Sequence, residues 1–185
     1  EGIGFALQVP ADHGSEMQQK LLPLQQNRRG PALAVGDLTG DEVDDICLGG
    51  TAGHPARVLE GNPHGIDDGS KHRKPLVDAR SYDLASSPSV DDGPLLIFDA
   101  NADGANDLLV SRGGARLRAG SPEYQPRLLL NNGAGDLVPA PDDALPALPV
   151  STGALAAADF NRDGQLDIFI GGRVVPGAYP QPPQS

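Results

Sequence analysis

Short apolar runs alternate with polar, turn-forming segments along most of the chain. The runs occupy residues 32–35, 46–48, 56–59, 76–79, 95–98, 108–110, 127–130, 137–138, 154–158 and 168–170, and three of them include one charged residue (Arg57, Asp78 or Arg127). Their length, and the Gly, Pro, Asn and Asp residues between them, are typical of buried β-strands joined by turns. The sequence therefore predicts an all-β fold, with a hairpin at Asn131, Asn132 and Gly133.

The first 30 residues follow a different pattern. Phe5, Leu7 and Val9 alternate with other residues as in a β-strand, and residues 16–22 have the length of one or two helical turns before Pro23. We expect an N-terminal strand and a connection in residues 1–30.

One polar segment between apolar runs occurs three times. Loop 1 (residues 37–45) reads DLTGDEVDD, loop 2 (residues 99–107) DANADGAND and loop 3 (residues 159–167) DFNRDGQLD. The loops start 62 and 60 residues apart, a period that indicates repeated supersecondary units. We therefore divide the chain into repeat 1 (31–92), repeat 2 (93–152) and an incomplete repeat 3 with a Pro-rich tail (153–185).

Each loop places oxygen ligands at its odd positions, as calcium-binding loops do. Four side chains and the seventh residue's carbonyl would supply them: Asp159, Asn161, Asp163, Gln165 and Asp167 in loop 3; Asp99, Asn101, Asp103, Ala105 and Asp107 in loop 2; Asp37, Thr39, Asp41, Val43 and Asp45 in loop 1. Ca²⁺ takes 6–8 oxygens at about 2.3–2.6 Å, and Gly at the sixth position permits the sharp turn. Loop 1 departs from this pattern with Thr39 and with Glu42 in place of that Gly.

An EF-hand is the alternative calcium site. Its loop has twelve residues, ends in a bidentate Glu and lies between helices. Here no Glu stands at the twelfth position, and the segments that follow are β-rich, such as 108–110 and 168–170. The pattern therefore favours a nine-residue loop between strands.

Composition and charge agree with this interpretation. The 24 Gly and 18 Pro favour short strands and turns, and aromatic residues at 4% predict a core of small side chains. The formal charge of -11 disfavours binding to nucleic acid or anionic membranes. Eleven acidic residues lie in the three loops, so three bound Ca²⁺ ions would change -11 to -5.

Other candidate chemistry is weaker. The single Cys47 lies in an apolar run and is expected to be a buried thiol. His64 and His72, among Lys and Arg residues, could bind an anion or lie in a solvated loop. A basic insertion at 112–126 contains Arg112, Arg116, Arg118 and Tyr124; it could contact a ligand, and pairing with the acidic loops is the preferred alternative.

The loops, with the apolar run before each one and the strand and Gly-Gly after it, resemble FG-GAP/VCBS-type repeats of integrin α-subunit propellers and bacterial secreted proteins. The resemblance covers residues 31–177 and implies β-propeller blades of four strands, each with a calcium loop between its first two strands. It also implies that the loop residues named above bind Ca²⁺. In this interpretation a left-handed Glu42 costs about 1 kcal/mol, and we expect loops 2 and 3 to fill before loop 1.

A closed propeller typically has 4–8 blades, more than this chain supplies. We therefore expect open blades, completed by other copies of the chain or by missing blades of a longer one; the start at Glu1, without a Met, suggests a processed or excised piece. The function that follows is non-enzymatic: an extracellular or cell-surface, calcium-stabilised segment for binding, adhesion or self-assembly, with a protein or carbohydrate ligand and no insertion into a membrane. The alternative is the propeller portion of a lyase-like, polysaccharide-acting enzyme, with His54, His64, His72, Arg116 and Tyr124 as candidates.

Overall fold

The computed structural model of the protein describes residues 31–51, 54–61, 76–81, 89–178 and 181–183. Sheet 1 contains β1 (Leu33–Gly36), β2 (Asp45–Leu48), β3 (Arg57–Gly61) and β4 (Leu76–Ser81). Sheet 2 contains β5 (Asp91–Phe98), β6 (Asp107–Gly113), β7 (Arg127–Asn131) and β8 (Leu137–Pro139). Sheet 3 contains β9 (Ser151–Ala158) and β10 (Asp167–Val174).

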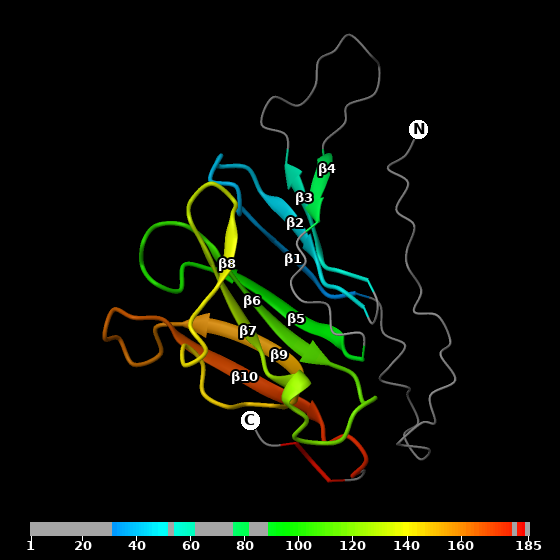
Figure 1. Cartoon of the computed structure of the whole chain (residues 1–185). Coiled ribbons are helices and arrows are strands. Elements are labelled where there is room, and N and C mark those ends of the chain that lie inside the picture. The colour runs from blue at the N-terminus through cyan, green and yellow to red at the C-terminus, as the bar shows by residue number, and fades with distance from the viewer. Residues whose placement is uncertain (1–30, 52–53, 62–75, 82–88, 179–180, 184–185) are drawn as a thin grey trace.

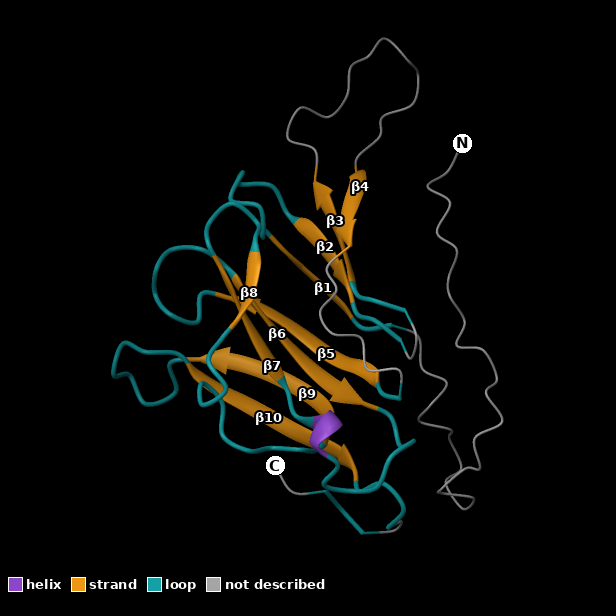
Figure 2. Cartoon of the chain, viewed as in Figure 1, coloured by secondary structure: helices purple, strands orange, loops and turns teal. Residues whose placement is uncertain are grey.

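The all-β prediction is confirmed. Strands that follow one another in the sequence pair antiparallel, so sheets 1 and 2 are four-stranded meanders (Figure 2). The predicted hairpin joins β7 to β8, with Asn131 opposite Leu137. Within the described ranges, the one helical element is a short 3₁₀ turn, η2 (Pro122–Tyr124), and no helix there is long and apolar enough to cross a membrane.

Some predictions fall on residues outside the described ranges. These are the N-terminal strand and helical turns in residues 1–30, and the candidate anion site at His64 and His72.

The three sheets stack face to face, with β1 against β5, and β5 and β6 against β9 (Figure 1). The core between sheets 1 and 2 consists of Leu38, Cys47, Val58, Leu95, Leu108, Val110 and Leu129. Because side chains alternate along a strand, Leu109, which is fully buried, lies on the opposite face of β6, toward sheet 3.

Small residues let the first two sheets approach closely. Ala32 and Ala34 pack against the core from the β1 side. A Cβ atom added to Gly36 would lie 3.0 Å from Cγ2 of Ile97. The glycine therefore leaves room for the larger side chain of the neighbouring sheet.

Sheet 3 differs from the other two because it has two described strands. β10 pairs with β9, and no other described strand pairs with its second edge. Phe169 on β10 is 47% exposed, whereas Cys47 and Leu109, at the same position in β2 and β6, are fully buried.

Candidate metal centre

The three predicted calcium loops occupy equivalent places in the three sheets. Loop 1 joins β1 to β2, loop 2 joins β5 to β6, and loop 3 joins β9 to β10. Since each links the first two strands of its sheet and the sheets stack in order, all three loops lie at one end of the stack (Figure 1). This placement agrees with the arrangement that the resemblance implies.

Loops 2 and 3 share one set of internal hydrogen bonds. The carboxylate of Asp99 accepts the main-chain N–H groups of Asp103 (3.2 Å) and Gly104 (2.9 Å), and that of Asp159 accepts those of Asp163 (3.0 Å) and Gly164 (2.9 Å). The side-chain amide of the third residue donates to the fifth: Asn101 to Asp103 at 2.8 Å, and Asn161 to Asp163 at 2.9 Å. Two sequences that agree only at the four side-chain ligand positions and Gly therefore adopt the same hydrogen-bonded turn.

The fifth residue of these two loops is a fully solvated carboxylate with a lowered pKa. The pKa of Asp103 is lowered by the main-chain N–H of Ala105 and then by Asn101, and that of Asp163 by the N–H of Gln165 and then by Asn161. Hydrogen bonds to the charged form favour ionisation. Both side chains therefore carry the charge that a cation would require.

Every loop contains two residues in the left-handed region, at its fourth and sixth positions. Loop 1 has Gly40 (φ 78°) and Glu42 (φ 64°) there. Loop 2 has Ala102 (φ 60°) and Gly104 (φ 90°), and loop 3 has Arg162 (φ 64°) and Gly164 (φ 86°). The left-handed backbone predicted at Glu42 is present, but each loop has one non-glycine residue in this conformation. Loop 1 differs only in having its glycine at the fourth position and not at the sixth.

The ninth residue of the loop is directed into the sheet. Asp45 accepts the N–H groups of Leu38 (2.8 Å) and Thr39 (3.0 Å) on Oδ2 and that of Gly61, the last residue of β3, on Oδ1 (2.8 Å). Asp107 likewise accepts the N–H of Ala100 on Oδ2 at 2.8 Å. On Oδ1 it accepts the N–H of Asn131, the last residue of β7, also at 2.8 Å. Both aspartates are fully buried, so the third strand of a sheet helps to hold the ninth ligand.

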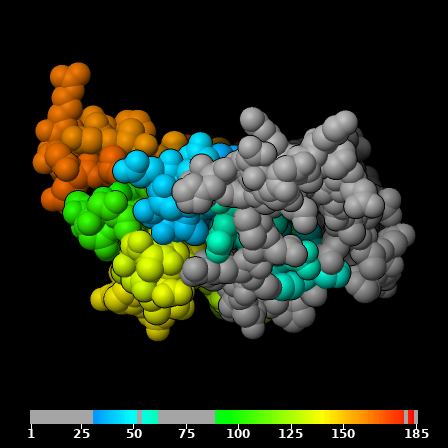
Figure 3. All heavy atoms as spheres, turned by 90° about the horizontal axis from the view of Figure 1, so that it is seen from above, coloured from blue at the N-terminus to red at the C-terminus, as the bar shows by residue number. Residues whose placement is uncertain are grey.

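Sheet 2 also holds loop 1 from outside. The side-chain amide of Asn131 donates to the carbonyl of Leu38, and that of Asn106 donates to the carbonyl of Asp37, at 2.8 and 2.9 Å. A Cβ atom on Gly40 would lie 2.6 Å from the carbonyl oxygen of Gly133 in the β7–β8 hairpin. In Figure 3 the blue atoms of loop 1 accordingly lie beside the yellow hairpin, while the orange atoms of loop 3 project from the body.

The side chains of these loops fit a hard cation by their chemistry. In the described part of the chain no three His, Cys, Asp or Glu side chains converge. The carboxylates of Asp99 and Asp159 accept main-chain amides. A carboxylate has about four acceptor sites, so those bonds leave capacity for an ion. The donors are all oxygens, which suits Ca²⁺ better than Zn²⁺.

Two further observations support the fit. The side chains at the third and fifth positions of loops 2 and 3 are exposed, so they can turn toward an ion without unpacking the core. In loop 1 the Thr39 hydroxyl oxygen is buried and has no hydrogen-bond partner among the described residues. All three loops therefore contain oxygen acceptors for a cation.

Comparison with known families addresses the same region. A family model described as an FG-GAP-like repeat matches residues 99–170, from the first residue of loop 2 into β10. This stretch is an FG-GAP-like repeat. FG-GAP repeats commonly bind Ca²⁺, in agreement with the donor sets of loops 2 and 3, and the small antiparallel sheets are consistent with FG-GAP propeller blades. No curated protein matches the sequence.

The family resemblance inferred from the sequence is thus confirmed over 99–170. Loop 1 lies outside the FG-GAP match, although it has the same place between strands and the same two left-handed positions.

A second polar cluster lies at the end of the sheets opposite the three loops. Asp92 at the start of β5 pairs with Arg112 at the end of β6, and both side chains are almost fully buried. Asp92 and Gly50 also exchange two hydrogen bonds. The N–H of Gly50 donates to the Asp92 carboxylate (2.5 Å), and the main-chain N–H of Asp92 donates to the carbonyl of Gly50 (3.0 Å). Burial raises the pKa of Asp92 although Arg112 opposes the change, and burial lowers the pKa of Arg112.

The basic insertion at 112–126 takes part in this cluster. Arg116 lies 3.8 Å from Asp91, and the buried Tyr124 exchanges hydrogen bonds through its hydroxyl with the main chain of Leu117. The preferred prediction, pairing with the acidic loops, is wrong about the partners: Arg112 and Arg116 pair with Asp91 and Asp92. The sequence signal for these partners was the pair of adjacent aspartates, Asp91 and Asp92, just before the apolar run at 95–98.

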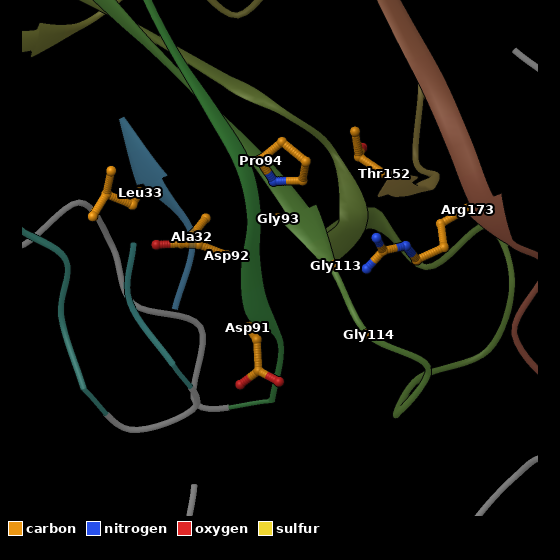
Figure 4. A pocket seen from close by; sticks show the side chains of 10 residues that line it. All are labelled: Ala32, Leu33, Asp91, Asp92, Gly93, Pro94, Gly113, Gly114, Thr152 and Arg173. Carbon is orange, nitrogen blue, oxygen red and sulfur yellow. The ribbon is translucent and has the colours of Figure 1, made fainter. Parts of the chain in front are cut away.

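A cavity of about 310 Å³ opens beside this cluster (Figure 4). Asp91 and Arg173 lie on different walls, and Gly93, Gly113 and Gly114 leave its floor without side chains. Of the candidate residues of the enzymatic alternative, the three in the described ranges (His54, Arg116 and Tyr124) do not line this cavity. His54 lies near Thr51 (3.5 Å between Nδ1 and Oγ1), and Tyr124 is buried.

Cys47 is buried, as predicted. Burial, with a smaller effect from Asp92, raises the pKa of its thiol to about 12. The thiolate that nucleophilic chemistry needs is therefore absent at neutral pH.

Proposed function

We propose that this protein is a non-enzymatic, calcium-binding β-propeller segment of an extracellular protein, serving binding, adhesion or self-assembly. The observation that carries the proposal is the common geometry of loops 2 and 3. Both present oxygen donors only, with one set of hydrogen bonds around the first Asp and a solvated, charged fifth residue.

The role of calcium in this proposal is structural. Each loop carries at least three acidic residues within nine positions at the end of a sheet, and a bound ion would offset their mutual repulsion. Because the unfolded chain lacks the arranged donors, the binding free energy becomes folding free energy.

An extracellular location follows from the expected affinity. Extracellular calcium modules bind with dissociation constants of about 10⁻⁴–10⁻³ M, which suits loops whose third and fifth ligands are exposed side chains. The partners in this proposal are further blades, from other copies or from a longer chain, and a protein or carbohydrate ligand.

A calcium titration by calorimetry, with thermal melting in calcium and in excess chelator, tests the proposal. We expect heat of binding and a higher melting temperature in calcium than in an equal concentration of magnesium. The double variant Asp103→Asn and Asp163→Asn should lose most of both effects, because each change removes a charged ligand. The matched control is Asp142→Asn, an exposed aspartate outside the loops; melting curves unchanged by chelator would contradict the proposal.

The state of assembly has its own measurement. Light scattering in calcium and then in chelator should show larger species only with calcium if blades of different copies complete each other. A monomer under both conditions would remove self-assembly and leave binding or adhesion.

The absence of catalysis is equally open to test. Incubation with acidic polysaccharides should give no rise in ultraviolet absorbance from unsaturated products. A rise that Arg116→Ala abolishes would favour the polysaccharide-acting alternative.

A further inference from the structure

The second edge of β10 is where sheet 3 differs from its neighbours. β2 pairs with β1 and β3, and β6 pairs with β5 and β7, whereas β10 pairs with β9 alone among the described strands. The main-chain groups along such an edge can receive another strand.

The third strands of sheets 1 and 2 show what fits this place. β3 reads RVLEG and β7 reads RLLLN. Both pair with the second strand of their sheet in the same register, counted from the Asp at the ninth position of the loop. The Arg lies opposite the third residue after that Asp, the next apolar residue lies opposite the second, and the Leu lies opposite the first. In β6 these partners are Val110, Leu109 and Leu108. The equivalent residues of β10 are Ile170, Phe169 and Ile168.

The last residue of each third strand also contacts the metal loop. The N–H of Gly61 donates to Oδ1 of Asp45, and the N–H of Asn131 donates to Oδ1 of Asp107, both at 2.8 Å. One strand thus extends the sheet and orients the ninth ligand of the loop.

Sheet 3 lacks this contact in the described structure. Oδ2 of Asp167 accepts the N–H of Phe160 at 3.0 Å, the bond that Ala100 makes in sheet 2, but no described residue donates to Oδ1. Asp167 is half-buried, whereas Asp45 and Asp107 are fully buried.

We propose that the second edge of β10 binds an extended strand with the pattern Arg–apolar–Leu–x–Gly/Asn, and that this strand strengthens cation binding by loop 3. It would run antiparallel to β10, with its Arg opposite Ile170, its Leu opposite Ile168, and its last N–H donated to Oδ1 of Asp167. The strand would also cover Phe169, which is 47% exposed.

The coupling has a direct physical reason. An amide that donates to one oxygen of Asp167 fixes the carboxylate before an ion arrives, so less ordering is left for the ion to impose. Linkage is reciprocal: calcium must strengthen binding of the strand by the same factor by which the strand strengthens binding of calcium. This part of the proposal rests on the proposed calcium-binding function; strand docking does not.

The probe is a synthetic peptide with the sequence of residues 125–133, QPRLLLNNG, extended by lysines for solubility. The control peptide has Pro in place of the first Asn, which keeps the apolar contacts and removes the N–H that would reach Asp167. The N–H signals of Gly104 and Gly164, followed by NMR in the intact chain, report on loops 2 and 3 separately. Loop 2 is an internal control, because its sheet already has β7.

We expect the peptide to lower the calcium concentration needed to shift the Gly164 signal by about five- to tenfold and to leave Gly104 unchanged. The Pro peptide should bind more weakly and produce no change in calcium affinity. The peptide should also shift the N–H signals of Ile168 and Ile170 in chelator.

Four results would overturn parts of the proposal. If the peptide does not bind the folded chain, β10 is not a docking edge; if it binds with no effect on Gly164, the coupling is wrong. If the chain dimerises through β10 and the peptide cannot compete, the occupant is a second copy. If calcium shifts neither glycine while the peptide still binds in chelator, the calcium function fails and strand docking stands.

Discussion

Loops 1 and 3 show that agreement with a motif and support from the surrounding structure are separate properties. Loop 3 matches the calcium pattern at every position, yet Phe160 is 66% and Leu166 is 47% exposed. Loop 1 has Thr39 and Glu42 at two pattern positions, yet sheet 2 holds its carbonyl groups through Asn106 and Asn131. The loop with the weaker motif is therefore the one held more firmly by its neighbours.

The same pair shows which part of the motif the backbone requires. The turn needs two left-handed residues, and a glycine at one of them is enough in all three loops. In loop 1 that glycine is Gly40, which also lies against Gly133 of the neighbouring sheet. Its position follows from contact between sheets as well as from the turn.

The largest effect should come from breaking the buried pair of Asp92 and Arg112, which joins sheet 2 to Gly50 of the segment after β2. Asp92→Asn removes the carboxylate charge that faces the buried Arg112, and loss of one member of a buried pair costs about 3–5 kcal/mol. Urea unfolding should show this loss. Hydrogen exchange should rise at Gly50, whose N–H donates to Asp92, and loop 3, which makes no described contact with Asp92, should be unaffected.

A double variant separates the lost charge partner from lost packing. Adding Arg112→Met to Asp92→Asn also removes the buried guanidinium charge, so the double variant should be more stable than Asp92→Asn alone. A double variant that is less stable would mean that the charge of Arg112 is satisfied without Asp92.

The ninth ligands offer the next test. Without calcium, Asp45→Asn should destabilise the protein by about 1–3 kcal/mol, since one oxygen replaces two and at least one buried amide loses its acceptor. Asp167→Asn should cost less, because one described amide donates to that half-buried side chain. Denaturant midpoints of the two variants measure the difference, and equal losses would contradict the claim that third strands support the ninth ligand.

The sequence predicted the strands and loops better than it predicted the contacts between sheets. Apolar runs and spaced aspartates are local signals, and the strands, the three loops and the β7–β8 hairpin follow from them. Asn131 was interpreted only as a turn residue, although it donates to a carbonyl of loop 1. Such a bond depends on how two sheets stack, which no local pattern contains.

The electrostatic partners were missed for a related reason. Arg112 and Asp92 are 20 residues apart and become neighbours through the pairing of β5 with β6. The composition showed excess acid in the loops, so those loops were the expected partners. The register of β5 with β6 instead places the start of β5 beside the end of β6, so Asp92 lies opposite Arg112.

Glycine substitutions should separate turn strain from contact between sheets. Gly164→Ala places a side chain at positive φ with nothing within 4 Å, so it should cost about 1–2 kcal/mol. Gly40→Ala meets the same strain, and its new Cβ would also lie 2.6 Å from the carbonyl oxygen of Gly133. Thermal melting should therefore show a larger loss for Gly40→Ala, and an equal loss would mean that the hairpin moves aside freely.

The smallest effect concerns the exposed loops, which depend mainly on their own hydrogen bonds. The pKa of Asp163 is lowered chiefly by the N–H of Gln165 and next by Asn161. Since the folded state favours the charged form, this contribution to stability is present above the ordinary Asp pKa and is lost as pH falls through the lowered value. Asn161→Ala removes one of the two bonds, so NMR titration of the calcium-free protein should show the pKa of Asp163 rising while that of Asp103 stays unchanged. If both values moved together, loops 2 and 3 would not be independent, and the view of loop 3 as a self-supported turn would be wrong.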